Sequence, residues 1–351
     1  MWYCVHLFSM EKITIKGRFA DSAIFTGERI NNLPHYIPSK GVYIITDGNV
    51  NAIYRGRFPE CPTFVVEPGE ASKSIQTVVK IYRWLLDSGA DRSSFIVAIG
   101  GGVICDIAGF VASTFMRGVK FGFVATSLLA QVDASVGGKN GIDLDGYKNI
   151  VGTFNQPQFV ICDVSMLITL PRIELANGFA EIVKHAIIAD AGQFAFIEAN
   201  VDRLNACDIE VITPLVEKSI RIKTNIVTAD EHESGERRKL NLGHTWGHAV
   251  EKVSGLPHGQ SVSIGLEFAA RLSCSKGVLG NREYFRLINL LRGLKLQVCS
   301  TMSQRKIFEA LLKDKKKEKD FIHFVLMEGI GSVRVEAISI QELKAFIKIE
   351  K

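Results

Sequence analysis

The sequence predicts an α/β domain, with a parallel sheet flanked by helices, followed by a mainly α-helical domain. Strand-like and helix-like segments alternate through residues 10–165, which is typical of strands joined by crossover helices. Helical spacing of apolar residues dominates from residue 171 onward. The chain has 351 residues, more than a single hydrophobic core ordinarily organises. We therefore expect two domains, residues 1–168 and residues 169–351.

The first domain is expected to contain a series of short strands. The run at 93–102 is apolar until it ends in three consecutive glycines, which indicates a buried strand entering a tight turn. Residues 74–89 place apolar side chains at helical spacing and predict an amphipathic helix. The segments with strand character are "KITIKG", "GVYIITD", "TFVVEPG", "SSFIVAIGGG", "FGFVATS" and "QFVICDV".

The second domain is expected to be a set of helices, and the chain shows no internal repeat. The helix predicted at 171–190 begins with a proline, which suits a first helical turn because no hydrogen bond is needed from its nitrogen. Further segments with helical spacing of apolar residues lie at 212–231, 243–255 and 258–277.

Charge and composition argue against several classes of protein. The formal net charge is +5 and the basic residues are spread along the chain, so we expect a small anionic substrate rather than a nucleic acid. No apolar run reaches the length of a membrane span, and no membrane partner is expected. The seven cysteines are odd in number and form no C-x-x-C pair, which predicts free thiols and a cytoplasmic location.

The N-terminal segment before Met10 lacks the basic region and long apolar core of a signal peptide. Met10 is followed directly by the alternating run "KITIKG" and is an alternative start. We therefore expect residues 1–9 to be dispensable.

The stretch "IGGGVICDIAGF" at 99–110 follows a strand and opens a helix, a position where backbone amides hold phosphate groups. It does not match the dinucleotide pattern G-x-G-x-x-G, because Cys105 occupies the place of the third glycine. The stretch is therefore either a tight strand-to-helix turn or part of a pyrophosphate site. In the second case, Asp106 on the first helical turn would face a ribose or a nicotinamide amide.

Other polar residues of the first domain allow both a structural and a ligand-binding interpretation. Asp47 ends a strand, at the edge where open parallel sheets bind ligands. Glu70 and Lys73 form either an ion pair at a helix start or a ligand contact. The stretch 131–149 is expected to be a loop that is either solvated or binds a phosphate or carboxylate, through Asp133, Lys139, Lys148 and Asn149.

Histidines and a carboxylate suggest a metal site in the second domain. Glu181 lies on a mostly apolar helix, where an unpaired charge is costly. Three protein ligands with an open fourth position describe a catalytic zinc site. Spacing alone would choose His244 and His248, four residues apart, as a pair of metal ligands. It does not say which of the histidines in these segments is not a ligand. Other polar residues of these segments are Lys184, His185, Arg237, Asn241, Glu251 and His258.

Sequence blocks that occur in a fixed order are more specific than any one of these motifs. The chain contains, in this order, "PGEASKS", "GGGVICDIAGFVASTFMRG", "SLLAQVDASVGGKNGID", "GYKNIVGTFNQP", "LPRIELANGFAEIVKHA", "DEHESGERRKLNLGHTWGHAVE", "HGQSVSIG" and "KDKK". Through these blocks the chain resembles the 3-dehydroquinate synthase family over roughly residues 40 to 335.

The resemblance implies an N-terminal NAD-binding domain, a C-terminal metal-binding domain and an active site in the cleft. It implies conversion of 3-deoxy-D-arabino-heptulosonate 7-phosphate (DAHP) to 3-dehydroquinate and phosphate, in the shikimate route to chorismate and aromatic amino acids. This carbon–oxygen lyase reaction reduces and reoxidises NAD within one turnover. The resemblance also implies a homodimer with NAD and one divalent metal, zinc or cobalt.

The resemblance further implies roles for individual residues. The metal ligands would be Glu181, His244 and His258. NAD would be held by Asp47, Glu70, Lys73, Gly101, Gly102, Val103, Asp106, Thr126, Ser127, Lys139, Lys148, Leu167 and Thr169. The substrate would be contacted by Arg117, Asp133, Lys139, Asn149, Lys184, Lys223, Arg237, Asn241, His248 and either Lys315 or Lys316.

Five positions depart from the family's usual pattern. Cys105 replaces a frequent glycine, "ATS" at 125–127 stands where Pro-Thr-Thr is common, His185 replaces a tyrosine and Gln260 a glutamate. Of these positions only Ser127 is assigned a role, and it keeps a hydroxyl.

Other functions remain as alternatives. One is another sugar-phosphate cyclase, acting on sedoheptulose 7-phosphate or glucose 6-phosphate, although Lys139, Lys184, Arg237 and Asn241 are all retained here. Another is a metal-dependent alcohol dehydrogenase with the same two-domain plan. A zinc hydrolase would need a general-base glutamate between His244 and His248, where the chain has Thr-Trp-Gly. The last is a non-catalytic binding protein.

Overall fold

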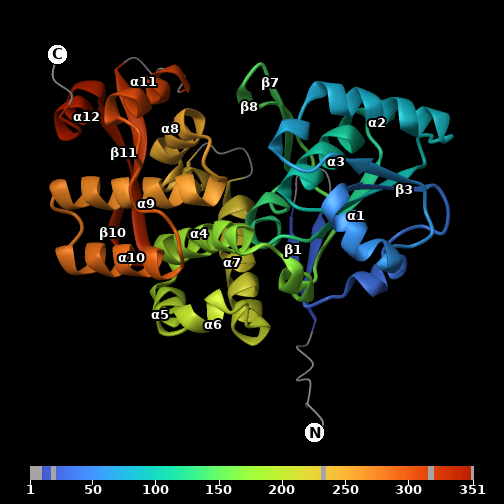
Figure 1. Cartoon of the computed structure of the whole chain (residues 1–351), viewed down its shortest axis with the longest axis horizontal. Coiled ribbons are helices and arrows are strands. Elements are labelled where there is room, and N and C mark those ends of the chain that lie inside the picture. The colour runs from blue at the N-terminus through green and yellow to red at the C-terminus, as the bar shows by residue number, and fades with distance from the viewer. Residues whose placement is uncertain (1–9, 17–20, 231–234, 315–319, 349–351) are drawn as a thin grey trace, which may run out of the picture. The chain divides into compact units, whose positions relative to one another are not determined.

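The computed structural model describes residues 10–16, 21–230, 235–314 and 320–348. The chain divides into two compact units, the first ending at Leu170 and the second beginning at Pro171 (Figure 1). Each unit has a hydrophobic core of its own, as expected of a domain. Within the described ranges, no helix is both long and apolar enough to cross a lipid bilayer.

The first unit is built on a sheet that has the order β1-β2-β9-β6-β5-β3-β4 in the described part of the chain. The strands from β2 to β4 in this order run parallel, and β1 pairs antiparallel with β2 at one edge. Every residue of β5 is buried, because both faces of a central parallel strand are covered. The strands are β1 (Glu11–Ile15), β2 (Ser22–Thr26), β3 (Val42–Asp47), β4 (Thr63–Val66), β5 (Phe95–Gly100), β6 (Lys120–Ala125) and β9 (Phe159–Cys162). The predicted α/β architecture is confirmed.

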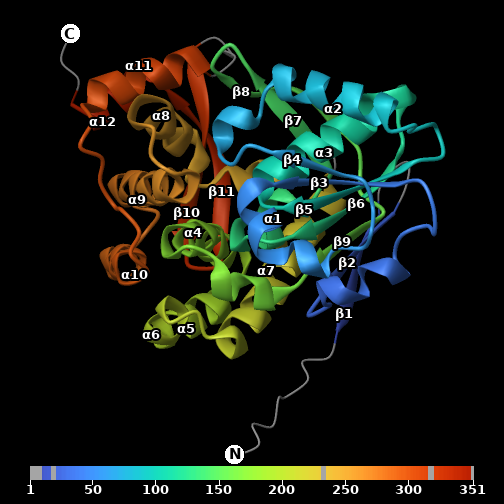
Figure 2. The same cartoon turned by 45° about the vertical axis from the view of Figure 1, so that its right-hand side comes forward.

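Helices cover this sheet (Figure 2). On one face, Ile44 and Val97 pack in one core with Leu33 of η1 and Tyr54 of α1, while α3 contacts β5 and β6. The helix predicted at 74–89 is observed as α2, and Ser74 caps it by accepting a hydrogen bond from the Thr77 amide. The helices are η1 (Ile30–His35), α1 (Gly48–Tyr54), η2 (Arg55–Arg57), η3 (Glu70–Ser72), α2 (Ile75–Asp87), α3 (Gly102–Thr114), η4 (Phe115–Arg117), η5 (Ala130–Ala134) and η6 (Val164–Thr169).

The expectation that 131–149 is a loop is wrong. The stretch contains most of η5 and enters an antiparallel hairpin of β7 (Lys139–Leu144) and β8 (Tyr147–Phe154). Asp145 and Gly146 form the turn, and both have positive φ, at 50° and 78°. An Asp-Gly pair with two positive φ angles gives the tight turn that matches the twist of a hairpin. The dipeptide was a hairpin signal that the sequence interpretation passed over.

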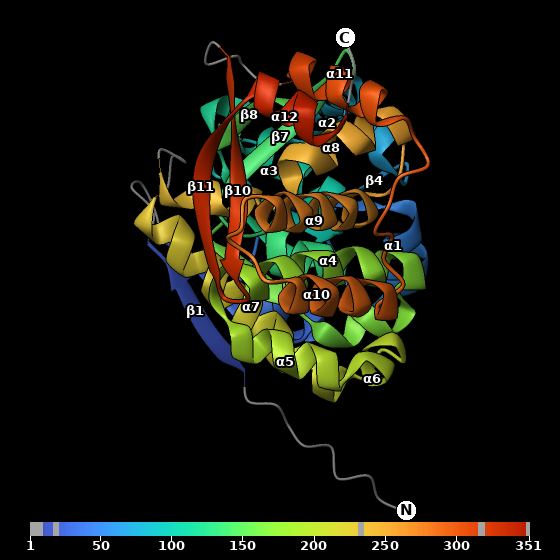
Figure 3. The ribbon, with the colours of Figure 1, turned by 90° about the vertical axis from the view of Figure 1, so that its left-hand side faces the viewer.

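The second unit is mainly helical, as predicted, and also contains a hairpin that the sequence interpretation missed. The hairpin, β10 (Phe321–Gly329) and β11 (Ser332–Ser339), lies beside α9, which β10 contacts (Figure 3). Trp246, Phe268 and Phe324 lie in the shared core. The helices are α4 (Arg172–Ala189), α5 (Ala191–Ala199), α6 (Val201–Asn205), α7 (Ile209–Ala229), η7 (Glu236–Asn241), α8 (His244–Ser254), α9 (His258–Ser275), α10 (Asn281–Gly293), α11 (Gln304–Asp314) and α12 (Ile340–Phe346).

Candidate metal centre and glycine turn

Three helices of the second unit bring a carboxylate and two imidazoles to one point. Glu181 lies in the middle of α4 and is fully buried, while His244 and His258 are the first residues of α8 and α9. The Nε2 atoms of both histidines lie 3.4 Å from Oε1 of Glu181. One ligand atom from each of the three residues lies within 4.8 Å of the other two. The three side chains therefore form one compact cluster.

The geometry of this cluster fits a tetrahedral metal ion. Ligand atoms at about 2.0 to 2.1 Å from zinc lie about 3.3 to 3.4 Å from one another in a tetrahedron. The two measured separations from Glu181 Oε1, both 3.4 Å, agree with this value. Two imidazole nitrogens and a carboxylate oxygen are also ligands that zinc and cobalt accept. The residues present thus suit a divalent metal with one position left open.

Close packing of α4, α8 and α9 depends on glycines. A Cβ atom at Gly259 would lie 2.4 Å from Asn177 Cα on α4, and one at Gly265 would lie 1.8 Å from the Gly243 oxygen before α8. Real Cβ atoms do not approach other atoms this closely, so only glycine permits these helix separations. The two glycines therefore allow α9 to approach the segments that carry Glu181 and His244.

A further contact orients each ligand of the cluster. Nδ1 of His244 lies 3.1 Å from the Leu242 carbonyl oxygen, and Nδ1 of His258 lies 3.5 Å from Oε2 of Glu251. These contacts leave both Nε2 atoms directed toward Glu181. The other oxygen of Glu181, Oε2, lies 2.6 Å from Nζ of Lys184. The buried charge of Glu181 is thereby balanced within the protein.

The two histidines respond differently to this environment. Burial and the nearby Lys184 ammonium hold the pKa of His244 well below its usual value, so its ring is neutral. Burial also disfavours the charged form of His258, but its hydrogen bonds with Glu181 and Glu251 outweigh burial and raise its pKa to about 10. Ligation by His258 requires the neutral ring and therefore the release of one proton.

Other predicted residues of the second unit lie in segments that carry or adjoin the cluster. The exposed ring of His248 lies 5.1 Å from that of His244 and 6.1 Å from that of His258. Asn241 and the buried Arg237 belong to η7, just before His244. Lys184 donates a hydrogen bond to the Leu240 oxygen, and Lys223 is buried on α7. Lys315 and Lys316 lie outside the described residues.

In the first unit, the predicted nucleotide-binding residues follow the carboxyl ends of neighbouring parallel strands. Asp47 ends β3 and caps α1, and Gly101 lies between β5 and α3 as a cap without a side chain. Thr126 and Ser127 follow β6, and Leu167 and Thr169 follow β9 in η6. This edge is where open α/β sheets bind their ligands.

The turn between β5 and α3 leaves little room for side chains. A Cβ atom at Gly101 would lie 3.3 Å from Ser127 Oγ, and one at Gly102 would lie 3.1 Å from Ala134 Cβ. Val103 follows in the first turn of α3, a helix of 13 residues. Backbone amides at such a helix start can hold a phosphate group, and Gly101 and Gly102 add no side chain of their own there. This favours the ligand-binding interpretation of the glycine stretch.

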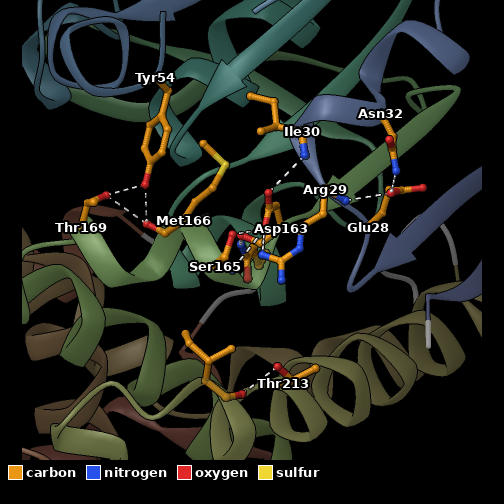
Figure 4. Close-up of polar contacts among 12 residues, drawn as sticks. Glu28, Arg29, Ile30, Asn32, Tyr54, Asp163, Ser165, Met166, Thr169 and Thr213 are labelled. Carbon is orange, nitrogen blue, oxygen red and sulfur yellow. Dashed lines mark hydrogen bonds and ion pairs between the residues drawn. The ribbon is translucent and has the colours of Figure 1, made fainter. Parts of the chain in front are cut away.

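Hydrogen bonds fix the segment after β9 (Figure 4). Asp163 accepts hydrogen bonds from the Ile30 amide at 3.1 Å and from the Ser165 amide at 3.1 Å. The Tyr54 hydroxyl lies 2.6 Å from Thr169 Oγ1 and donates to the Met166 oxygen at 3.2 Å. These bonds tie η6, with Leu167 and Thr169, to η1 and α1 of the same unit.

Charged residues predicted to contact NAD pair with one another. Nζ of the buried Lys73 lies 2.5 Å from Oδ2 of Asp106, and Lys148 lies 3.4 Å from Glu70. Burial lowers the pKa of Lys73, but the attraction of Asp106 and Glu70 outweighs burial and raises it above its usual value. Lys73 is therefore a permanent cation that holds Asp106 in place.

The predicted substrate residues of the first unit are more scattered than its predicted NAD residues. Asp133 lies in η5, Lys139 begins β7 and Asn149 lies in β8 with a φ of 52°. Arg117 follows the C-terminal end of α3, whereas the glycine turn is at its N-terminal end. Thirteen helical residues at about 1.5 Å each separate them by about 20 Å. The chain does not bring Arg117 to the glycine turn.

The chain has the fold of solved sugar-phosphate cyclases. The structure matches 2-epi-5-epi-valiolone synthase from Streptomyces hygroscopicus subsp. jinggangensis 5008, solved with NAD⁺ and Zn²⁺, with a TM-score of 0.86 and 24% identity over 95% of this chain and 97% of that chain. It also matches 2-deoxy-scyllo-inosose synthase, solved with carbaglucose-6-phosphate, NAD⁺ and Co²⁺, with a TM-score of 0.84 and 24% identity over 96% and 99%. At these identities the likeness shows the fold.

Within this class, the chain belongs to the 3-dehydroquinate synthase family. Models of the N-terminal and C-terminal parts of 3-dehydroquinate synthase match residues 63–177 and 178–317. The chain is 38% identical to the 3-dehydroquinate synthase of Alkaliphilus metalliredigens (strain QYMF), over 89% of this chain and 91% of that protein. It is 43% identical to that of Geotalea uraniireducens (strain Rf4), over 78% and 77%. The resemblance that the ordered blocks indicated is confirmed.

Proposed function

We propose that this protein is a 3-dehydroquinate synthase, which converts DAHP to 3-dehydroquinate and releases phosphate. The observation that carries the proposal is the convergence of Glu181, His244 and His258 in a member of this family. The identities of 38% and 43% to curated 3-dehydroquinate synthases support this activity over that of a cyclase specific for another sugar phosphate. The NAD⁺ and the Zn²⁺ or Co²⁺ of the two structural neighbours support the same cofactors here.

Glu181, His244 and His258 would hold the metal, and the glycine turn with Lys73 and Asp106 would hold NAD. In that arrangement the bound metal would supply a Lewis acid that favours deprotonation of a substrate hydroxyl. The bound NAD would supply a reversible hydride acceptor for the carbon that carries this hydroxyl, with the hydride returned to the substrate within the same turnover. Lys184 would orient Glu181, because its ammonium lies 2.6 Å from Oε2, the carboxylate oxygen that does not face the histidines. The metal is proposed to be zinc, with cobalt able to replace it.

The remaining polar residues suit an anionic, polyhydroxylated substrate. Arg237 and Lys223 are buried cations of the second unit that match the charges of carboxylate and phosphate. His248 is exposed beside the cluster and would move a proton at a substrate hydroxyl, since an imidazole has one nitrogen that can accept a proton and one that can donate it. Once the substrate hydroxyl is oxidised to a ketone, the neighbouring C–H is acidic and phosphate can leave by elimination. The protein's task is then to hold one conformer of the substrate.

The family also supports proposals about the setting of the enzyme. We infer a carbon–oxygen lyase of the shikimate pathway, acting in the cytoplasm as a homodimer. The predicted free thiols are consistent with this location, because Cys105 and Cys162 are buried and unbridged.

Phosphate release tests the proposed function. Metal-stripped protein with NAD and zinc should release phosphate from DAHP, and should not release it from sedoheptulose 7-phosphate or glucose 6-phosphate. Without added metal the activity should be lost, and zinc or cobalt should restore it. Absence of phosphate release from DAHP, or full activity in the stripped protein, would contradict the proposal.

A further inference from the structure

Both ring nitrogens of His258 face a carboxylate. Nε2 lies 3.4 Å from Oε1 of Glu181, in the metal cluster, and Nδ1 lies 3.5 Å from Oε2 of Glu251. Glu251 is 8% exposed and lies on α8, seven residues after His244 and therefore on the same face of that helix. The helix that supplies one metal ligand thus also supplies the partner of another ligand.

The two ligand histidines have partners of different charge. Nδ1 of His244 faces a neutral backbone oxygen, that of Leu242, at 3.1 Å. Nδ1 of His258 faces a carboxylate that the fold has buried in spite of the cost of removing a charge from water. A buried carboxylate is retained more readily when it serves a charged or polarised partner. An imidazole that donates Nδ1–H to a carboxylate has a fixed tautomer and a more basic Nε2.

We propose that Glu251 is a positioning residue of the metal centre. It accepts the Nδ1–H of His258, keeps Nε2 of that ring directed at Glu181 and strengthens its bond to the metal. This inference rests on the metal binding of the proposed function, and it assigns a role to a residue outside the ligand set. Glu251 touches neither the metal nor the substrate in this arrangement.

Zinc affinity in the absence of substrate tests the role of Glu251. Metal-free protein is titrated with zinc in competition with a chromophoric chelator. Glu251→Ala should bind zinc about 10- to 100-fold more weakly than the unchanged protein, the usual effect of losing such a partner. Glu251→Gln should lose less, because its amide oxygen still accepts the Nδ1–H of His258. At saturating zinc, both variants should recover kcat with little change in KM.

A matched control separates this role from general stability. Glu267 lies on α9, is also largely shielded, and contacts Arg271 at 3.0 Å and Tyr284 at 3.0 Å. Glu267→Ala removes a carboxylate of the same unit without changing a contact of His258. Its zinc affinity should equal that of the unchanged protein, even if its unfolding temperature falls. If Glu251→Ala does not fold, Glu251→Gln carries the comparison.

Three results would overturn the role of Glu251. One is unchanged zinc affinity in both Glu251 variants, and another is an equal loss in Glu267→Ala. The third is a second zinc equivalent that disappears in Glu251→Ala, because His248, Glu251 and His258 also lie within ligand distance of one another and would then form a site of their own. Since the titration contains no DAHP, failure of phosphate release alone would reject the proposed activity and leave this inference standing.

Discussion

Glu181 shows how a single buried side chain depends on several partners. Its two oxygens face the imidazoles of His244 and His258 on one side and the ammonium of Lys184 on the other. The sequence indicated that a carboxylate on this apolar helix needs partners, because burial of an unpaired charge is costly. Residue spacing could not identify His244 and His258 as these partners, since they approach Glu181 only through tertiary packing, and only the family resemblance pointed to them.

Helical spacing made His244 and His248 equivalent, and their surroundings make them different. His244 is held by the Leu242 oxygen and faces Glu181, whereas His248 is exposed. His244→Ala should therefore lose bound metal. His248→Ala should retain metal and lose rate by about 10²- to 10⁴-fold, the usual contribution of a proton-transfer group. Metal content by atomic emission and turnover with DAHP check both variants, and equal metal loss would contradict the difference in roles.

Glycines on α9 set how closely the helices of the second unit approach. Gly259 and Gly265 lie within a family block of the sequence, but their role could not be predicted from it, because a close approach between helices is visible only once both partners are placed. Gly259 faces backbone atoms of Asn177, one helical turn before Glu181, and Gly265 faces the Gly243 oxygen, directly before His244. The close packing of α4, α8 and α9 is therefore part of the metal centre.

Gly259→Ala should disturb this packing. The added Cβ would lie 2.4 Å from the Asn177 backbone, so α9 must move and carry His258 with it. We expect the free energy of unfolding to fall by about 1 to 3 kcal/mol, as for other overpacked sites, together with a loss of zinc affinity. The control is Gly56→Ala, because nothing lies within 4 Å of a Cβ at Gly56. Denaturant unfolding and zinc titration check both variants. Unchanged zinc affinity in Gly259→Ala would contradict the dependence of the metal centre on this helix packing.

Strands and helices with strong apolar patterns were predictable, and the hairpins were less so. The apolar run before the glycines gave β5, and helical spacing gave α2 and α4. The β7–β8 hairpin was missed because its strand β8 is mostly exposed and lacks a clear apolar pattern. Hairpin β10–β11 lies beyond the last segment for which the sequence predicted an element, and its strands become stable only on the shared core with Phe268.

At the scale of the whole molecule, the residues proposed for NAD and for the metal belong to different units. A similar fold occurs in a probable glycerol dehydrogenase from Sinorhizobium meliloti 1021, at a TM-score of 0.61 and 15% identity. The fold alone therefore does not distinguish a cyclase from a dehydrogenase. The distinction rests on family membership and on the reaction that the protein catalyses.

The NADH balance separates these two reactions. A cyclase returns the hydride within each turnover, so absorbance at the NADH band should stay flat while phosphate accumulates from DAHP. A dehydrogenase should instead form NADH in proportion to the alcohol consumed. Phosphate and NADH are followed in the same sample, and stoichiometric NADH would favour the dehydrogenase.

The position of Trp246 gives the protein an optical probe of its own metal centre. The indole is buried two residues after His244 and stacks on Phe268 with ring centroids 4.0 Å apart. The chain has three tryptophans, and replacing Trp2 and Trp84 with phenylalanine would leave Trp246 as the sole source of indole emission. Cobalt, which absorbs visible light and is paramagnetic, should then quench this emission as it binds, whereas zinc should not. A fluorescence titration would report metal occupancy in real time, without substrate, label or chelator.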